Sequence, residues 1–493
     1  MMIASDMVSA EDGSAEPYDL ALIGGTVIDG TGLPAYRADV YVADGRVARI
    51  DHNAPPRPAR ETHRVDGHVV APGFIDVHTH DDIALIADPA MRAKVSQGVT
   101  TVITGLCGYS AAPFAPGVEP PEEYGILLRG AQDRFESFAS YLDAVAEARP
   151  AVNWLPLVGH STLRLSAMDR LDRPASPPEL DAMLADLERA LDAGAAGISS
   201  GLAYAMARHA STEELIALCR AMSGRGGLYV THLRDEADGL LDSVEEALRI
   251  GREAGVGVVF SHHKAIGAVN HGRTKDSLAL IDRARQSQEV ALDVYPYTYS
   301  STSLTREKAA RGGRVVVTRS GTHPEFAGVD LDVVAEHLGC SRDEAIARLQ
   351  PAGALYHMMD EADVARVLAH DLTMIGSDGL PFDACPHPRL WGTFPRVLQR
   401  YVRQTGLLSL ETAIHRMTGL PAQVFGLSDR GTLRPGHIAD IVVFDPDSIA
   451  DNADAQDPTK PATGIQNVLV RGQQASLGTG SALHSNRASE CTP

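Results

Sequence analysis

Residues 71–80 read APGFIDVHTH, a short apolar run that ends in two histidines, His78 and His80. Four further apolar runs end in the same way, each in a residue type that binds metal ions. They are VTTVITGLCG (99–108) with Cys107, LYVTH (228–232) with His232, VGVVFSHH (256–263) with His262, and LTMIGSDG (372–379) with Asp378. Barrel enzymes carry their chemistry at the C-terminal ends of parallel strands. The pattern therefore predicts one parallel barrel with a metal at its rim.

Strand-like and helix-like segments alternate from residue 71 to residue 425. One helix is expected to begin after Ser176, where Glu179 completes a capping box, and to end at Gly194. A second capping box, Ser211 with Glu214, marks the next helix. Such alternation predicts βα units around a parallel sheet. The number of units favours a closed barrel over an open doubly wound sheet, although periodicity alone leaves the open sheet possible.

The two ends of the chain differ from this middle part. Residues 18–70 and 426–475 alternate apolar and polar side chains, and Asp44-Gly45 is a strong hairpin signal. Each end is too small for a core of its own, so one composite β-sandwich domain built from both ends is expected. The lead over residues 1–17 and the tail over residues 476–493 are predicted to be disordered.

Residues 303–356 interrupt the strand–helix rhythm with several arginines and a Gly-Gly pair. An insertion of this size is usually a cover for an active site or an interaction surface. We expect a lid here; the alternative is a solvated excursion with no role.

Composition limits the partners. The chain has 493 residues and a formal net charge of −20, which argues against nucleic acid and anionic membranes as partners. Its five cysteines are scattered and odd in number, so a reduced, cytoplasmic setting is expected. No apolar run approaches the ~20 residues of a membrane span, and the first residues lack the pattern of a signal peptide. The sequence leaves the oligomeric state open.

Each metal-ligand candidate has an ordinary structural alternative. Cys107 can be a small buried hydrophobic residue, although Gly105 and Gly108 beside it let a thiolate approach a metal. Single histidines after strands are more often structural than catalytic, and Ser-Asp-Gly around Asp378 is a common turn sequence. Chance would rarely place a metal-binding residue type at several separate strand ends. The pattern therefore favours a metal site.

The same segments resemble the N-acyl-D-amino-acid deacylases (D-aminoacylases) of the amidohydrolase superfamily. The similar stretches, spread from residue 19 to residue 472, are PGFIDVHTHDD, GVTTVITGLCG, THLRDE, SHHK, DVYPYTYSST, MDEADV, GSDGLPFDACPHPRLWGTFPRVL and GTLRPGHIADIVVFD. The resemblance implies a (β/α)8 TIM-type barrel of the metal-dependent hydrolase kind, with a composite β-sandwich, a lid and zinc. It implies a tight zinc site at Cys107, His232 and His262, and a weaker second site at His78, His80 and Asp378.

The implied reaction is hydrolysis of the amide bond of N-acyl-D-amino acids. Three protein ligands leave zinc a position for water, whose pKa falls to ~7 there. Asp378, the family's catalytic aspartate, is expected to take the water proton and return it to the leaving nitrogen.

The substrate is expected to be a small molecule with a free α-carboxylate. Arg389 can bind a carboxylate through two donors, and Lys264 lies two residues after His262. The resemblance adds a tyrosine and serines to this carboxylate site. The candidates are Tyr204, Tyr297, Ser300 and Ser301.

The identity of the D-residue is left open. After Tyr204 the chain reads AMARHAS where a Tyr-Pro-Pro run is expected, and the insertion carries Arg319. Met206 would suit a hydrophobic side chain, and Arg319 or Arg208 an acidic one.

Two other functions compete with this prediction. A cyclic amide hydrolase of the dihydropyrimidinase or hydantoinase type would require a carboxylated bridging lysine, and no lysine follows a strand convincingly between Cys107 and His232. A non-catalytic scaffold of the same fold would be expected to have lost ligands, and none is missing.

Overall fold

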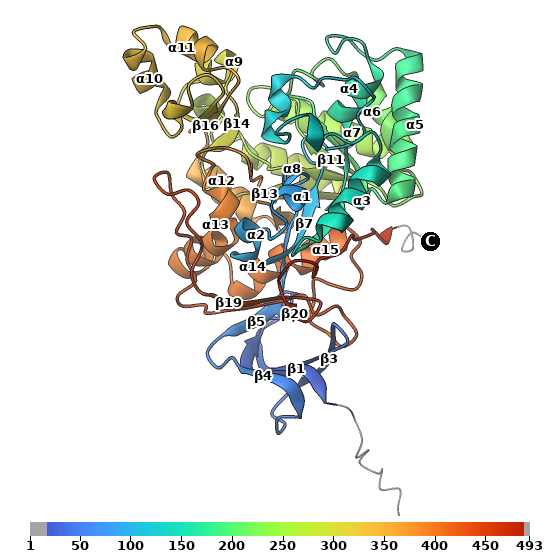
Figure 1. Cartoon of the computed structure of the whole chain (residues 1–493), viewed down its shortest axis with the longest axis vertical. Coiled ribbons are helices and arrows are strands. Elements are labelled where there is room, and N and C mark those ends of the chain that lie inside the picture. The colour runs from blue at the N-terminus through green and yellow to red at the C-terminus, as the bar shows by residue number, and fades with distance from the viewer. Residues whose placement is uncertain (1–16, 488–493) are drawn as a thin grey trace, which may run out of the picture.

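The computed structural model describes residues 17–487 (Figure 1). The predicted disordered lead, except for Pro17, lies outside the described residues, and so do residues 488–493 of the predicted tail.

Eight parallel strands close into a barrel, counting β8 and β9, which only Leu157 separates, as one strand. In chain order they are β6 (Phe74–Asp76), β7 (Val99–Thr104), β8 (Asn153–Pro156) with β9 (Val158–Gly159), β10 (Gly197–Gly201), β11 (Leu228–His232), β12 (Gly257–Phe260), β13 (Val290–Val294) and β17 (Thr373–Ile375). A parallel bridge between Thr79 and Gly379, just past β6 and β17, closes the ring. The predicted (β/α)8 fold is confirmed.

The helices between these strands pack their apolar faces on the barrel. They include α3 (Phe138–Ala148), α5 (Pro177–Ala193), α6 (Thr212–Arg220), α7 (Leu240–Ala254), α8 (Thr274–Ala284), α12 (Glu361–Ala369), α13 (Arg389–Arg396) and α14 (Leu410–Met417). Helix α5 begins after the predicted Ser176–Glu179 capping box and ends at Gly194. Its residues Met183 and Leu187 are fully buried, as an amphipathic helix on a barrel requires.

Strands from both ends of the chain form one eight-stranded sheet below the barrel, in which the C-terminal strand β18 pairs with the N-terminal strand β5 (Figure 1). The strands are β1 (Tyr18–Val27), β2 (Tyr36–Ala43), β3 (Arg46–Asp51), β4 (Ala59–Arg64), β5 (Val69–Pro72), β18 (Ile441–Phe444), β19 (Ile465–Val470) and β20 (Gln473–Gln474). Asp44 and Gly45, with φ of 52° and 71°, form the predicted turn between β2 and β3.

The segment after Ser476 differs from the predicted disorder as far as Arg487. Ser481 donates its backbone N–H to Asn153, and Leu483 donates to the carbonyl of Trp154 at 2.9 Å. The Leu483 side chain is buried with the residues that fill the barrel, next to α15 (Gly419–Val424). Hydrogen bonds to the barrel and one buried apolar side chain thus anchor a segment whose composition resembles that of a disordered tail.

The insertion folds as a small unit with its own apolar core. Strands β14 (Ser300–Ser303), β16 (Ala352–Tyr356) and β15 (Val315–Ser320) form an antiparallel sheet. The helices of the unit are α9 (Arg306–Ala310), α10 (Leu331–His337) and α11 (Arg342–Leu349). Residues of β14 and α9 line the pocket described below, so the unit borders the site; its role as a lid stays a prediction.

Candidate metal centre and substrate pocket

Three strand ends bring one sulfur and two nitrogens together. The Sγ of Cys107 lies 3.3 Å from Nε2 of His262 and 3.7 Å from Nδ1 of His232. Those two nitrogens are 2.9 Å apart. All three side chains are buried. A thiolate and two imidazoles are the donor set of many zinc sites, and three protein ligands leave zinc a fourth position. The residues present therefore fit zinc.

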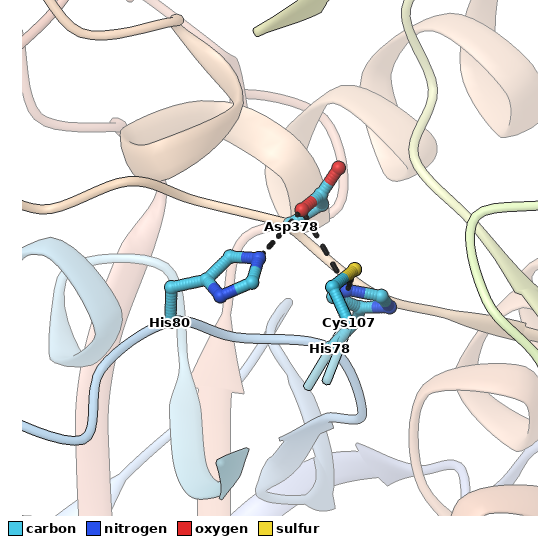
Figure 2. A group of neighbouring side chains, drawn as sticks. All are labelled: His78, His80, Cys107 and Asp378. Atoms are coloured by element: carbon cyan, nitrogen blue, oxygen red, sulfur yellow. Dashed lines mark hydrogen bonds and ion pairs between the residues drawn. The ribbon is translucent and has the colours of Figure 1, made fainter. Parts of the chain in front are cut away.

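A second group of ligand types shares Cys107. Figure 2 shows His78, His80 and Asp378 around it. Oδ1 of Asp378 lies 3.2 Å from Nε2 of His80 and 3.6 Å from Nε2 of His78. The Cys107 sulfur is also 3.3 Å from Nε2 of His78. The thiolate thus stands between the two predicted metal positions.

The backbone at this centre is held in an unusual conformation. Cys107, His262 and Asp378 have positive φ values of 54°, 35° and 51°. Such a conformation costs of order 1–3 kcal/mol for a residue other than glycine, and it clusters at functional sites. Beside Cys107, a Cβ on Gly105 would lie 2.0 Å from the carbonyl oxygen of Leu157. The sharp turns that follow these strands point the ligand side chains over the barrel mouth.

Charge within the centre keeps its anionic groups ionised. Burial alone would raise the pKa of the Cys107 thiol, but the imidazoles of His78 and His262 outweigh burial and hold the pKa well below its usual value. Burial likewise opposes ionisation of Asp378, yet the Arg389 guanidinium and His262 hold its pKa well below the usual range. The centre therefore offers a thiolate and a carboxylate, the forms that bind metals and accept protons.

Two carboxylates that the sequence did not single out support the ligand histidines. Glu236 lies 3.2 Å from Nδ1 of His262 and 3.7 Å from Nε2 of His232, on the side of each ring away from Cys107. Asp293, at the end of β13, lies 3.2 Å from Nδ1 of His78. Such partners fix the orientation and tautomer of a ligand imidazole. The available signals were the spacing of four residues from His232 to Glu236 and the place of Asp293 at a strand end.

A buried lysine ties two strand ends together. The Nζ of Lys94 donates to Asp76 and to the hydroxyl of Ser377, both at 2.8 Å, and lies 3.2 Å from Asp81. Asp76 in turn accepts the backbone N–H of Ser377, next to Asp378. This network fixes Asp378 relative to the histidines that follow β6.

Glu236 gives a first prediction. Replacing it with glutamine, which keeps the size but loses the charge, should weaken zinc binding about 10- to 100-fold. Competition with a chromogenic chelator measures the change. Glu213→Gln is the matched control, because Glu213 pairs with Arg249 on the surface. Equal zinc affinity in the Glu236 variant and the wild type would show that the contact is incidental.

A pocket of about 570 Å³ opens next to the centre, and Asp378, His232 and His262 are part of its wall. Arg389 is fully buried behind it. Its Nη1 lies 2.8 Å from Oδ2 of Asp378 as an ion pair, and its Nη2 donates to the carbonyl of Ser301 at 3.3 Å. The buried Nε has no hydrogen-bond partner in the described structure. A buried guanidinium with a free donor is suited to bind a carboxylate.

The other predicted binding residues divide into two groups. Tyr204, Lys264, Ser300 and Ser301 all line the pocket. The Tyr204 hydroxyl lies 3.4 Å from Nδ1 of His232, and the Lys264 ammonium donates to Glu236 at 2.6 Å. Tyr297 instead points away from the pocket and donates its hydroxyl to Asp451 at 3.0 Å.

Tyr295 takes the place expected of Tyr297. It lines the pocket, and the Arg389 guanidinium lies 4.5 Å from the centre of its ring. Strand β13 ends at Val294, and the backbone N–H of Tyr297 bonds to the carbonyl of Tyr295 across Pro296. This turn breaks the strand period of two, so residues two apart no longer face the same side.

The residues considered for side-chain selectivity are engaged elsewhere. Met206 is buried and is not among the residues that line this pocket. Arg319 forms an ion pair with Asp383 at 3.0 Å. Arg208 does border the pocket, but it is paired with Glu307 at 3.1 Å. The question of selectivity therefore moves to other pocket residues.

Within residues 17–487, no helix is both long enough and apolar enough to cross a bilayer.

Comparison with known proteins connects this geometry to characterised chemistry. The sequence pattern of the amidohydrolase family matches residues 65–255 and 327–475. The chain is 50% identical to D-aminoacylase of Alcaligenes xylosoxydans xylosoxydans over 458 residues, 93% of this chain and 94% of the relative. It is 48% identical to N-acyl-D-aspartate deacylase of the same organism, over 95% of this chain and 94% of the relative.

A solved structure is equally similar. N-acyl-D-glutamate deacylase of Bordetella bronchiseptica, in complex with zinc and a phosphonate mimic of the tetrahedral intermediate, superposes with a TM-score of 0.92. It is 47% identical, and the match covers 95% of this chain and all of that one.

Proposed function

Because the chain belongs to the amidohydrolase family, we propose that it hydrolyses the amide bond of N-acyl-D-amino acids with the help of zinc. The products are a carboxylate and a free D-amino acid. One observation carries the proposal: a thiolate, imidazoles and an ionised carboxylate meet beside a buried arginine with a free donor. Relatives that cover nearly the whole chain, D-aminoacylase and N-acyl-D-aspartate deacylase, support it.

Each ligand residue has a role in this proposal. Cys107, His232 and His262 would hold the tight zinc, and His78, His80 and Asp378 a weaker second ion. Zinc, when bound, supplies a Lewis acid that activates water and polarises the amide carbonyl. Asp378 accepts the proton of the attacking water and gives it to the leaving nitrogen. The Tyr204 hydroxyl, which burial keeps protonated by raising its pKa, adds a hydrogen-bond donor beside the ligands.

Arg389 connects substrate binding to this proton transfer. Without substrate its guanidinium compensates the charge of Asp378. When a substrate α-carboxylate binds Arg389, the positive charge of the guanidinium is divided between two carboxylates. Asp378 is then stabilised less as an anion, so its pKa rises toward its usual value. The carboxylate then holds a proton more readily at the stage when the leaving nitrogen needs one. Tyr295, Lys264 and Ser301 complete the proposed carboxylate site.

The competing functions have less support. In a cyclic amide hydrolase of the dihydropyrimidinase kind a carboxylated lysine would bridge the metals, but here Cys107 occupies the position between the two ligand groups. Lys94 and Lys264, which contact residues around the centre, already pair with carboxylates. A non-catalytic scaffold would not need Asp378 held ionised in the pocket wall.

We further propose a cytoplasmic location, a small carboxylate-bearing substrate as partner, and no nucleic-acid partner. The net charge of −20 and the scattered cysteines support this. Cys107, Cys219, Cys340 and Cys385 are free thiols.

The proposal is tested with matched N-acetyl-D- and N-acetyl-L-amino acids, scored by the released amine. Only the D-series should be hydrolysed, and turnover should stop when zinc is removed by chelation. Hydrolysis of dihydropyrimidines or hydantoins in preference to every linear amide would contradict the proposal.

Arg389 gives a second prediction. Arg389→Ala should raise KM for N-acetyl-D-methionine about 10- to 100-fold, because a charge-assisted contact to its carboxylate is lost. N-acetyl-D-methionine amide, which lacks the charge, is the matched control and should be affected much less. An equal rise in KM for the acid and the amide would mean that Arg389 acts only through its ion pair with Asp378 and does not bind the substrate carboxylate.

A further inference from the structure

One cation of the substrate pocket, Lys308, forms no ion pair within the described residues. Most charged side chains that line the pocket are paired: Lys264 with Glu236, Arg208 with Glu307, Arg234 with Glu246, and Arg311 with Asp235 and Glu307. Lys308, on α9, forms no ion pair with any carboxylate of residues 17–487. Its Nζ reaches only the hydroxyl of Thr302, at 3.4 Å, and lies 5.1 Å from the centre of the Tyr204 ring.

The position of Lys308 relates it to the reacting end of the pocket. Tyr204 contacts both Lys308 and His232, because the Lys308 ammonium lies over its ring and its hydroxyl lies 3.4 Å from Nδ1 of His232. Arg389 lies against a different ring, that of Tyr295. Lys308 is thus separate from Arg389 and Lys264, the two cations of the proposed α-carboxylate site.

The surroundings of Lys308 are suited to an anion. Thr302, Ser303 and Thr305 line the same pocket as Lys308 and offer hydroxyl groups. Burial lowers the pKa of Lys308 to about 8, although several acidic groups act in the opposite direction. Lys308 is partly buried. A partly buried ammonium without an ion-pair partner is less stable than one in water, and a ligand that brings a negative charge reduces that cost.

We propose that Lys308 binds a second carboxylate of the substrate, so that the preferred substrates are N-acyl-D-amino acids with two carboxylates. This inference rests on the proposed function and makes it more specific. The second carboxylate can come from the side chain, as in D-aspartate or D-glutamate, or from a dicarboxylic acyl group such as succinyl. Both sources share the chemistry that Lys308 recognises.

Glu123 is the group that opposes this assignment. It lines the same pocket, and its buried Oε2 has no hydrogen-bond partner in the described structure. If Glu123 were the recognition group, the pocket would select a cationic side chain, such as that of D-lysine. If Lys308 is the recognition group, Glu123→Gln removes a repulsive charge and improves the hydrolysis of dicarboxylates.

The experiment compares kcat/KM for substrate pairs of nearly equal shape. N-acetyl-D-glutamate is paired with N-acetyl-D-glutamine, and N-succinyl-D-leucine with N-succinamoyl-D-leucine; N-acetyl-D-lysine and N-acetyl-D-leucine complete the set. The acid should be preferred in at least one pair by about 10- to 100-fold, and the pair concerned identifies the source. Lys308→Met should reduce that ratio to about one, and Lys308→Arg should restore most of it.

The outcomes separate the two proposals. If no N-acyl-D-amino acid is hydrolysed, the proposed function itself fails. If N-acetyl-D-leucine is hydrolysed but neither acid is preferred, or the preference survives Lys308→Met, only the role of Lys308 is overturned. A preference for N-acetyl-D-lysine that disappears in Glu123→Gln would also overturn it. Because each ratio is measured within one variant, a partly unfolded preparation does not change it.

Discussion

Asp378→Asn lowers kcat about 10²- to 10⁴-fold and leaves the tightly bound zinc in place. The magnitude is that of a lost general acid–base group. Zinc should be retained because the proposed tight site consists of Cys107, His232 and His262, and Asp378 belongs only to the second group. Steady-state turnover of an N-acetyl-D-amino acid and metal analysis of the same preparation measure both effects.

Asp378→Asn changes the charge next to Arg389 as well as the proton transfer. The variant also leaves Arg389 without its ion-pair partner, which changes the affinity for the substrate carboxylate. For this reason kcat at saturating substrate, and not KM, is the relevant quantity. Asp371→Asn is the control, since Asp371 pairs with Arg285 at the surface. Wild-type turnover in the Asp378 variant would disprove the acid–base role.

Cys107→Ala loses both zinc and turnover. The Cys107 thiolate lies at the centre of both ligand groups, and the nearby imidazoles that keep it ionised cannot replace its sulfur as a ligand. Zinc bound by two remaining histidines would lack the third protein ligand that a catalytic zinc site normally has. Metal content after dialysis and the rate of amide hydrolysis are the two measurements.

Cys219→Ala provides a control of the same chemistry. Cys219 is also fully buried, but burial raises the pKa of its thiol and it belongs to no ligand group in the described structure. This variant should keep its zinc and its activity. If the Cys107 variant still binds zinc tightly, the tight ion is held elsewhere.

The barrel and the convergence of the candidate ligands could be predicted because each candidate directly follows an apolar strand. In a parallel barrel the C-terminal ends of all strands lie at the same rim, so a residue that follows a strand lies at that rim. Glu236 and Lys94 could not be assigned in this way, because neither follows a strand directly and their roles depend on partners from other elements. Asp293 does lie at the end of a strand, but its role depends on its contact with His78. Tyr297 was expected in the pocket, but Tyr295 lines it instead, because a turn at Pro296 shifts the register after β13.

Other differences have the same origin in tertiary contacts. Glu214 was expected to close a capping box with Ser211, but its side chain turns inward to Arg164 and His160. The Ser211 hydroxyl still accepts the backbone N–H of Glu214, so the helix begins where predicted. Leu483 packs under the barrel although the residues around it resemble a disordered segment. In each case one buried contact outweighs the local preference.

The most direct test is a titration of zinc into metal-free protein, followed by hydrolysis of an N-acetyl-D-amino acid. We predict no turnover without metal and a linear rise that reaches its maximum at about one zinc per chain, because one set of three ligands suffices for a catalytic site. Turnover by the metal-free protein, or a rate that does not change as zinc is added, would contradict the account.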